Sequence, residues 1–323
     1  MTLRSLMIAV LAASVLVAAP AAAQSWPTKP ITLIVPFPPG GGTDAFARPL
    51  SAQLSKQLGR QVIIDNRGGA GGTVGASIAA KAAPDGYTFF VGAVHHAIAP
   101  SFYPKLDYNI ETDLVPLTVI ANPPQIVVVN PGRVKVDDFK SFMVLLRANP
   151  GKLNYASAGN GTSHHRAGEL FKQQSNTFIV HIPYRGAGPA LQDLITGNVD
   201  MMFDGLGSSA QHIRSGRIKP LAVAAPKRSP AFPNVPTTAE VGMPDYVVST
   251  WYAVWGVKGT PKDILDRMHA EIVKAVGSPE LKDIWAGNGS DTATMSQQEF
   301  AKFLNSEIKR WAAVTKSSGA KLD

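Results

Sequence analysis

The sequence is organised around Ile31-Thr-Leu-Ile-Val-Pro-Phe-Pro-Pro-Gly-Gly-Gly-Thr-Asp44. Residues 31–35 are apolar or β-branched, which predicts a buried strand, and the prolines end it because proline cannot donate to a sheet ladder. The three glycines allow backbone conformations that are closed to other residues. Thr43 and Asp44 are good N-cap residues for a helical pattern that continues through Leu58. A strand, a glycine loop and a helix N-terminus in this order direct backbone N–H groups at an anion.

This glycine loop matches neither of the common phosphate-binding fingerprints. Its G-G-G-T-D pattern differs from the G-x-G-x-x-G of dinucleotide-binding folds, and no Lys-Ser or Lys-Thr pair follows the glycines as in a P-loop. For this stretch alone, a tight strand-to-helix turn without a ligand stays open as the alternative. The anion-site interpretation gains support because the rest of the chain repeats this order of strand, glycine-containing loop and helix.

The composition excludes several classes of protein. The 323 residues are enough for two domains with a sizeable core. The net charge is +8, but basic runs are no longer than two residues, as at Lys227-Arg228, and none carries interleaved aromatics. This pattern argues against nucleic-acid binding and for a solvated surface that mildly attracts anions. The absence of cysteine excludes disulfides, zinc–thiolate sites, iron–sulfur clusters and cysteine nucleophiles.

Residues 1–23 have the pattern of a secretory signal peptide. Arg4 supplies the positive n-region, Leu6 to Ala19 the apolar h-region, and Ala21-Ala22-Ala23 a small-residue cleavage site. An uncleaved anchor is the alternative, but the apolar run is short for crossing a bilayer. We therefore predict export to the periplasm, with cleavage after Ala23.

Strands and helices alternate behind the opening unit. Further strands are predicted at 61–65, 87–92, 114–120, 125–130, 154–157, 178–183, 199–203, 221–225 and 249–256. Helical patterns separate most of them, and three more helices are predicted at 261–276, 279–287 and 296–317. This alternation predicts parallel sheets with helices on both faces.

Two lobes account for this order of elements. Predicted strands end in glycine and hydroxyl residues at 36–44, 157–165, 183–189 and 203–209. In parallel sheets, ligands sit outside the carboxyl ends of the strands. The first of these stretches precedes a boundary at Pro123-Pro124 and the others follow it, so the lobes would face each other across a cleft. We expect lobe one to comprise residues 25–124 and 246–323, and lobe two residues 125–245.

Several single residues allow more than one interpretation. Ser163 lies beside His164, but adjacent residues project differently, G-x-S-x-G is missing, and no orienting acid can be placed near them for a Ser–His hydrolase. Arg185 could clamp a carboxylate through two parallel hydrogen bonds or pair with a surface acid. Asp204 could accept a hydrogen bond from a ligand amine or cap a helix.

A metal site is a second enzymatic alternative. His95-His96 and His164-His165 lie at predicted strand ends, and Asp44 and Asp204 lie on similar loops, so the ligand types are reasonable. However, H-E-x-x-H is missing and neighbouring histidines are not a ligand spacing. One histidine of each pair can instead cap a helix while the other faces solvent.

The sequence resembles a known family over essentially the whole mature chain. The matching motifs are W-P-x-K-P-I-T-L-I-V-P-F-P-P-G-G-G-T-D, V-I-I-D-N-R-G-G-A-G-G, P-D-G-Y-T, A-G-N-G-T-S-H-H-x-A-G-E-L-F, H-I-P-Y-R-G and D-x-M-F-D. Together they resemble the Bug family, the periplasmic substrate-binding proteins of tripartite tricarboxylate transporters. The resemblance implies an α/β, two-lobe clamshell fold, each lobe a mainly parallel sheet flanked by helices. It also implies non-enzymatic capture of a small carboxylate and delivery to a membrane permease.

The resemblance further implies which residues surround the ligand. In the family the carboxylate is held mainly by backbone N–H groups, hydroxyls and ordered waters, which agrees with the glycine loops. By position, lobe one would supply Pro38, Gly40, Gly41, Thr43 and Asp44. Lobe two would supply Ala158, Gly159, Thr162, Ser163, His164, Tyr184, Ala187 and Asp204. We expect a monomer without a metal or cofactor.

Two features depart from the family pattern. Relatives usually carry Ser or Thr after the third strand, where this chain has Gly92-Ala-Val-His-His96, and Pro49 should kink the first helix. If the lobes close, His95 or His96 should approach the ligand together with His164. An imidazole can stack on an aromatic acid or pair with a distal carboxylate, which favours an aromatic mono- or dicarboxylate as ligand. A hydrolase or metal-dependent enzyme in the same cleft is the alternative.

Overall fold

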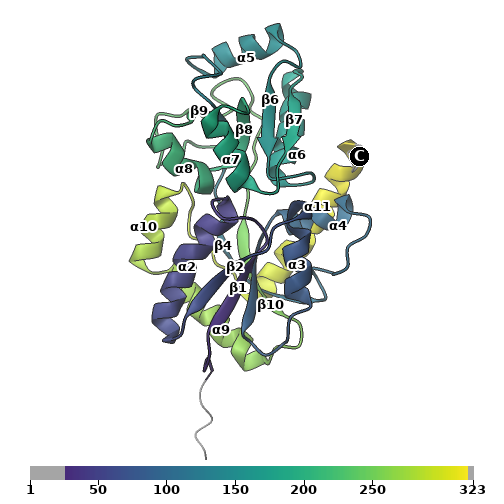
Figure 1. Cartoon of the computed structure of the whole chain (residues 1–323), viewed down its shortest axis with the longest axis vertical. Coiled ribbons are helices and arrows are strands. Elements are labelled where there is room, and N and C mark those ends of the chain that lie inside the picture. The colour runs from purple at the N-terminus through teal and green to yellow at the C-terminus, as the bar shows by residue number, and fades with distance from the viewer. Residues whose placement is uncertain (1–25, 319–323) are drawn as a thin grey trace, which may run out of the picture.

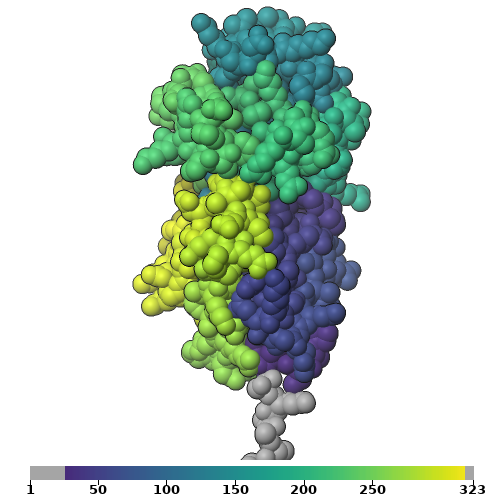
Figure 2. All heavy atoms as spheres, turned by 90° about the vertical axis from the view of Figure 1, so that its left-hand side faces the viewer, coloured from purple at the N-terminus to yellow at the C-terminus, as the bar shows by residue number. Residues whose placement is uncertain are grey.

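The computed structural model describes residues 26–318, which form two lobes (Figure 1). Each lobe is built on a five-stranded sheet flanked by helices. The predicted signal segment and its cleavage site after Ala23 lie outside the described residues. Figure 2 shows the lobes meeting along a common boundary, with the C-terminal segment beside the N-terminal one in the same lobe.

The lobe-one sheet has the strand order β2-β1-β3-β10-β4. Strand β1 pairs in parallel with β2 and β3, and β10 pairs antiparallel with β3 and β4. The strands are β1 (Ile31–Val35), β2 (Val62–Asn66), β3 (Thr88–Ala93), β4 (Leu114–Ala121) and β10 (Tyr252–Val257).

The lobe-two sheet has the strand order β7-β6-β8-β5-β9. Here β6 pairs in parallel with β7 and β8, and β5 pairs antiparallel with β8 and β9. The strands are β5 (Gln125–Val129), β6 (Asn154–Ser157), β7 (Val180–Pro183), β8 (Met201–Gly205) and β9 (Lys219–Val223).

Helices cover both sheets. Lobe one carries α2 (Gly42–Leu58), the short 3₁₀ turn η1 (Ala70–Gly72), α3 (Thr73–Ala80), α4 (His95–Phe102), α9 (Lys262–Val276), α10 (Pro279–Gly287) and α11 (Gln297–Ser318). Lobe two carries α5 (Phe139–Ala148), α6 (Ser163–Ser175), α7 (Ala187–Thr196) and α8 (Leu206–Arg214). None of the helices within residues 26–318 combines the length and apolar character that crossing a bilayer requires.

The core of lobe one follows from the alternation of side chains along β1. Leu33 and Val35 point to one face of the sheet and pack with apolar residues of α2, α9 and α10. Ile34 points to the other face and packs with residues of α3, α4 and α11. Because both faces are covered, the strand reads as a continuous apolar run, which is why its sequence predicts burial.

Each sheet contains one reversed strand in the fourth position, β10 in lobe one and β5 in lobe two. The other four strands of each sheet run in the same direction, as the expected mainly parallel sheet requires, but the pairing is mixed. In both lobes the reversed strand is the one that enters directly from the other lobe. The alternation of strands and helices does not reveal this reversal, because it depends on how the chain crosses between lobes.

The two crossings between the lobes lie side by side. The N–H of Gln125 donates to the carbonyl of Val248 at 2.9 Å, and the N–H of Thr250 donates to the carbonyl of Pro123 at 3.1 Å. Pro124 and Ser249 form an antiparallel bridge between them. The crossings are therefore a short two-stranded connection, and they are the segments where a hinge motion would concentrate.

Some predicted element boundaries are wrong by a few residues. The N-cap of α2 is Gly41 rather than Thr43 or Asp44. Pro49 lies inside α2, which is one uninterrupted helix over its whole length. The helical pattern that follows the strand predicted at 125–130 forms α5 only from Phe139, because Asp138 makes a capping box at its N-terminus.

Candidate ligand-binding site

Four helices begin at one small cavity between the lobes. In lobe one, α2 begins at Gly42 and α4 at His95, and in lobe two, α6 begins at Ser163 and α7 at Ala187. The first N–H groups of a helix have no intrahelical acceptor, and the macrodipole places partial positive charge there. The cavity is lined by Phe37, Gly41, Gly42, Thr43, His95, Ala158, His164, Ala187 and Tyr252. This convergence suits an anion.

The lobes are closed on this cavity. Its volume is about 10 Å³, which is about the room that one water molecule needs. The N–H of Ser163 in lobe two donates to Nδ1 of His95 in lobe one at 3.1 Å, and Tyr103 Oη donates to the carbonyl of Asn160 at 2.9 Å. Larger hollows of about 940 and 750 Å³ lie beside α5 and between α6 and α11, but no comparable set of helix N-termini converges on them.

Asp44 shapes the lobe-one loop from behind. One of its carboxylate oxygens accepts from the N–H of Gly40 at 3.0 Å and from Arg48 Nε at 2.7 Å, and the other accepts from Asn66 Nδ2 at 3.1 Å. The carboxylate is buried and does not line the cavity, whereas Thr43 does. Asp44 therefore fixes the loop whose N–H groups face the cleft.

The corresponding loop of lobe two is held by its own side chains. Thr162 is the N-cap of α6, and its hydroxyl donates to the carbonyl of Gly159 at 2.7 Å. Ser157 Oγ accepts from the N–H of Gly159 at 3.1 Å, and His165 Nδ1 accepts from the N–H of Gly161 at 3.1 Å. Gly159 and Gly161 have φ of +123° and +74°, which few other residues adopt. The loop conformation is thus fixed by bonds within lobe two.

His181 supports the same loop, and the sequence analysis missed it. Its Nε2 lies 2.6 Å from Ser157 Oγ, and its ring stacks on that of His165 at 4.2 Å between centroids. Burial lowers the pKa of His181 to about 3, so the ring is neutral at neutral pH. The pairing of β6 with β7 places His181 beside Tyr155, and only that register reveals the contact.

Asp204 and His164 form a buried pair at the cavity. Asp204 lies within β8 rather than capping α8, whose N-cap is Gly205. Its Oδ1 lies 3.2 Å from His164 Nε2, and its Oδ2 accepts from the hydroxyls of Ser208 and Ser209 at 2.7 and 2.5 Å. The carboxylate is completely buried. The two side chains are therefore in contact beside the cavity, although Asp204 Oδ1 makes no hydrogen bond among residues 26–318.

The two predicted lobe-one histidines lie in different surroundings. His95 lines the cavity, and its ring centroid lies 5.7 Å from that of His164 and 5.2 Å from that of Phe37. Burial lowers the pKa of His95 well below its ordinary value, with a further contribution from His164. His96 points instead into lobe one, where Nδ1 accepts from the N–H of Ala93 at 3.1 Å and the ring packs edge-on against Phe90.

The buried His96 makes acid destabilise the fold. Burial lowers the pKa of His96 to about 4, whereas a histidine in an unfolded chain titrates near 6.5. Between these values the unfolded chain binds more protons, so we expect the free energy of unfolding to fall as the pH drops from 6.5 to 4, by up to about 3 kcal/mol from this residue. Denaturant unfolding at pH 7 and 4.5 measures this loss, and the His96→Gln variant should lose less stability between the two values. Equal losses in both proteins would contradict the prediction.

Several predicted residues stay outside the cavity. Tyr184 Oη donates to Asp193 Oδ2 at 2.6 Å, and Arg185 is exposed on the loop before α7. Pro38 packs against the backbone of Gly186 across the lobe boundary. Conversely, Phe37 and Tyr252 line the cavity without having been predicted. Tyr252 begins β10 next to a crossing, and this position is the signal that could have identified it.

Neither enzymatic alternative is supported by the site. The hydroxyl of Ser163 has no hydrogen-bond partner among residues 26–318, so it is not paired with His164 as a nucleophile. Asp204 does lie next to His164, through Oδ1, and accepts from Ser208 and Ser209 through Oδ2, but no bond links His164 to the Ser163 hydroxyl. The described part of the chain also contains no group of three His, Cys, Asp or Glu residues that could hold a metal ion.

Comparisons with known proteins agree with this geometry. A family model described as "Tripartite tricarboxylate transporter family receptor" matches residues 46–320. Protein BugT of Bordetella pertussis is 38% identical over 308 residues, which are 95% of this chain and 94% of BugT. Rpa4515 of R. palustris, solved with adipate, has a TM-score of 0.88 at 35% identity and covers 92% of this chain and 100% of its own. MatC of Rhodopseudomonas palustris, solved with bound malate, has a TM-score of 0.82 at 31% identity and covers 90% and 99%.

The two sheets, the paired crossings and the cleft between the lobes define a periplasmic solute-binding protein, the fold class expected from the sequence. The chain belongs to the receptor family of tripartite tricarboxylate transporters. BugT is similar to this chain over nearly its whole length. The family consists of transporter receptors and not of enzymes, so the expected absence of catalysis is confirmed. The resemblance inferred from the motifs is confirmed as well.

Proposed function

We propose that this receptor captures a small carboxylate between its lobes and delivers it to the membrane permease of its transporter. The observation that carries the proposal is the convergence of the N-termini of α2, α4, α6 and α7 on one cavity. Within residues 26–318, no lysine or arginine lines this cavity. An anion bound there would be held by backbone N–H groups and hydroxyls, as suits a carboxylate.

The rings around the cavity favour a flat or extended carboxylate. Phe37 and His95 meet edge-to-face at an interplanar angle of 84°, and Tyr252 closes another side of the cavity. Such rings can pack against an aromatic acid or the methylene chain of a diacid. The adipate of Rpa4515 and the malate of MatC support a dicarboxylate as the second possibility. We therefore propose an aromatic mono- or dicarboxylate or an aliphatic dicarboxylate as ligand.

The other expectations extend this proposal to the whole protein. We propose an exported monomer, cleaved after Ala23, that works in the periplasm. Its lobes would comprise residues 25–124 with 246–323, and residues 125–245. The position of β10 inside the lobe-one sheet and the packing of α11 against α4 support the return of the chain to lobe one.

A thermal-shift screen tests the ligand class. The panel comprises malate, adipate, citrate, benzoate and phthalate, with glucose as the control that lacks a carboxylate. A ligand at about 100 times its Kd should add roughly 2.7 kcal/mol to the free energy of unfolding. Stabilisation by carboxylates alone would support the proposal. Stabilisation by glucose, or by none of the acids, would contradict it.

A further inference from the structure

The pair formed by Asp204 and His164 is unlike the other buried charges of lobe two. His164 Nε2 faces Asp204, while His164 Nδ1 has no hydrogen-bond partner among residues 26–318. The side chain of His164 is 5% exposed and the residue lines the cavity. The hydroxyl of its neighbour Ser163 is likewise buried and without a partner in the same range. Unpaired buried polar atoms are costly, so two of them beside one cavity indicate a missing polar partner. Asp204 Oδ1, which faces His164 Nε2, likewise makes no hydrogen bond in this range.

The charges around the pair determine the state of the imidazole. The buried Asp204 carboxylate receives two neutral hydroxyl donors, from Ser208 and Ser209, and the only group of opposite charge that contacts it within residues 26–318 is His164. A buried carboxylate without a counter-charge is unfavourable, and His164 is the described side chain placed to supply one.

The other titratable groups described near the pair do not supply the positive charge that Asp204 lacks. His95 faces His164 from α4, and burial keeps its pKa well below the ordinary value. His212 of α8 lies near Asp204, and burial lowers its pKa too. Tyr252 of β10 lies on the other side, and burial raises its pKa, which keeps the phenol neutral.

We propose that Asp204 is a positioning residue that holds His164 as an imidazolium, so that Nδ1–H donates to the ligand carboxylate together with the Ser163 hydroxyl and the N-terminus of α6. Asp204 itself does not touch the ligand. This inference rests on the proposed carboxylate function and specifies how the anion is recognised. The receptor would bind its ligand with one charged side chain whose counter-ion is built into lobe two.

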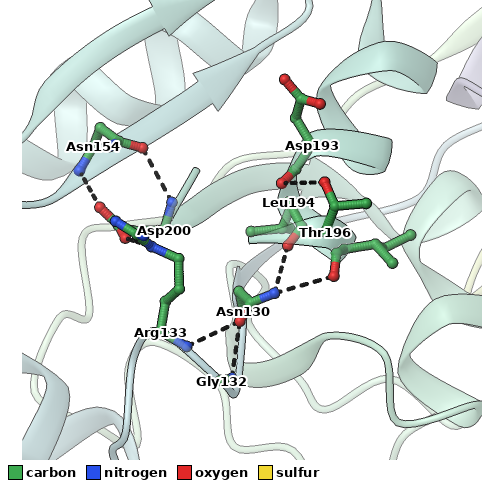
Figure 3. A network of polar contacts seen from close by, with 9 residues as sticks. Asn130, Gly132, Arg133, Asn154, Asp193, Leu194, Thr196 and Asp200 are labelled. Atoms are coloured by element: carbon green, nitrogen blue, oxygen red, sulfur yellow. Dashed lines mark hydrogen bonds and ion pairs between the residues drawn. The ribbon is translucent and has the colours of Figure 1, made fainter. Parts of the chain in front are cut away.

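The structure offers a matched control for removing the charge. Asp200 is also a buried carboxylate of lobe two, just before β8, but it accepts from Arg133 Nε at 2.7 Å and from the N–H of Asn154 at 2.9 Å (Figure 3). Its oxygens are thus satisfied by residues away from the cavity. Asp200→Asn removes a buried charge from lobe two without changing the site, whereas Asp204→Asn removes the one that holds His164.

Imidazole ¹⁵N chemical shifts of the unliganded protein test the positioning. We expect a hydrogen on both ring nitrogens of His164 in the parent and in Asp200→Asn. In Asp204→Asn the imidazolium signal should be lost at a pH at which the parent retains it. A neutral ring in the parent, with a hydrogen on only one of its nitrogens, would overturn the proposal, whether or not a ligand is known.

Calorimetry with the tightest-binding acid among malate, adipate, benzoate and phthalate tests recognition. Asp204→Asn should weaken binding by roughly 10- to 100-fold at neutral pH, the range expected for one charge-assisted hydrogen bond. The pH above which affinity is lost should move downward, since the imidazolium no longer has its counter-charge. Asp200→Asn should keep the affinity and the pH profile of the parent.

The outcomes separate the two proposals. If the parent binds an acid and Asp204→Asn binds it with the same affinity and pH profile, the role of Asp204 is wrong and the carboxylate function stands. If Asp204→Asn and Asp200→Asn lose affinity equally with parallel pH profiles, the effect is one of folding and the positioning role is wrong. If the parent binds none of the acids, the proposed function fails, and recognition through His164 fails with it.

Discussion

Replacing Gly188 by alanine should prevent the lobes from closing and weaken carboxylate binding by at least about 100-fold, or about 2.7 kcal/mol. A Cβ atom on Gly188 would lie 2.1 Å from the carbonyl oxygen of Pro39, across the lobe boundary. This neighbour is backbone and cannot move aside as a flexible side chain would. Gly188 lies in the first turn of α7, where alanine favours the helix, so lobe two should fold normally.

The matched control for this variant is Gly287→Ala. Gly287 also lies at a contact between the lobes, but a Cβ there would be 3.8 Å from the nearest atom, on Arg214. Calorimetry should show parent-like affinity for the control, and small-angle scattering should show a smaller radius of gyration on addition of ligand in the parent and control only. Parent-like binding by Gly188→Ala would mean that the ligand-bound lobes do not approach as closely as this structure shows.

Trp285→Ala should lower the free energy of unfolding by roughly 3–5 kcal/mol, the usual loss when a large buried aromatic is truncated. Trp285 of α10 is completely buried, its Nε1 donates to the carbonyl of Ile120 in β4 at 2.6 Å, and its ring meets Phe46 of α2 at 5.1 Å between centroids. The variant would leave a cavity and an unsatisfied carbonyl where the C-terminal segment joins the rest of lobe one.

Denaturant unfolding followed by circular dichroism measures this loss, with Ile284→Ala as the control. Ile284 is the preceding residue on the same helix and is 36% exposed, so its truncation should cost much less. If both variants lost the same stability, or if Trp285→Ala lost less than about 1 kcal/mol, α10 would not be an integral part of the lobe-one core.

The sequence predicted those parts of the fold that depend on local pattern. The apolar run of β1 and the following glycine loop predicted a strand and a helix within one or two residues of their observed bounds. The reversal of β5 and β10 could not be predicted in this way, because strand direction depends on the path between lobes. Asp204 was placed in a loop, although pairing with Ile126 keeps it in β8.

The candidate site was predictable where backbone geometry decides it, as at Gly41, Thr43 and Ala187, which all line the cavity. It was less predictable where the direction of a side chain decides it. His95 and His96 are neighbours, yet the first reaches the cavity and the second enters the lobe-one core. Successive helical residues point in different directions, and only the packing of α4 determines which of them faces the cleft.

The place of β10 in its sheet has a consequence for the order of folding. Lobe two is built from one continuous segment, whereas the lobe-one sheet has β10 inserted between β3 and β4. When the chain emerges N-terminus first, β4 has no neighbour in its own sheet until β10, beyond residue 250, has also emerged. Lobe two can therefore become native first, while the unfinished edge of lobe one stays exposed to chaperones and to aggregation during export.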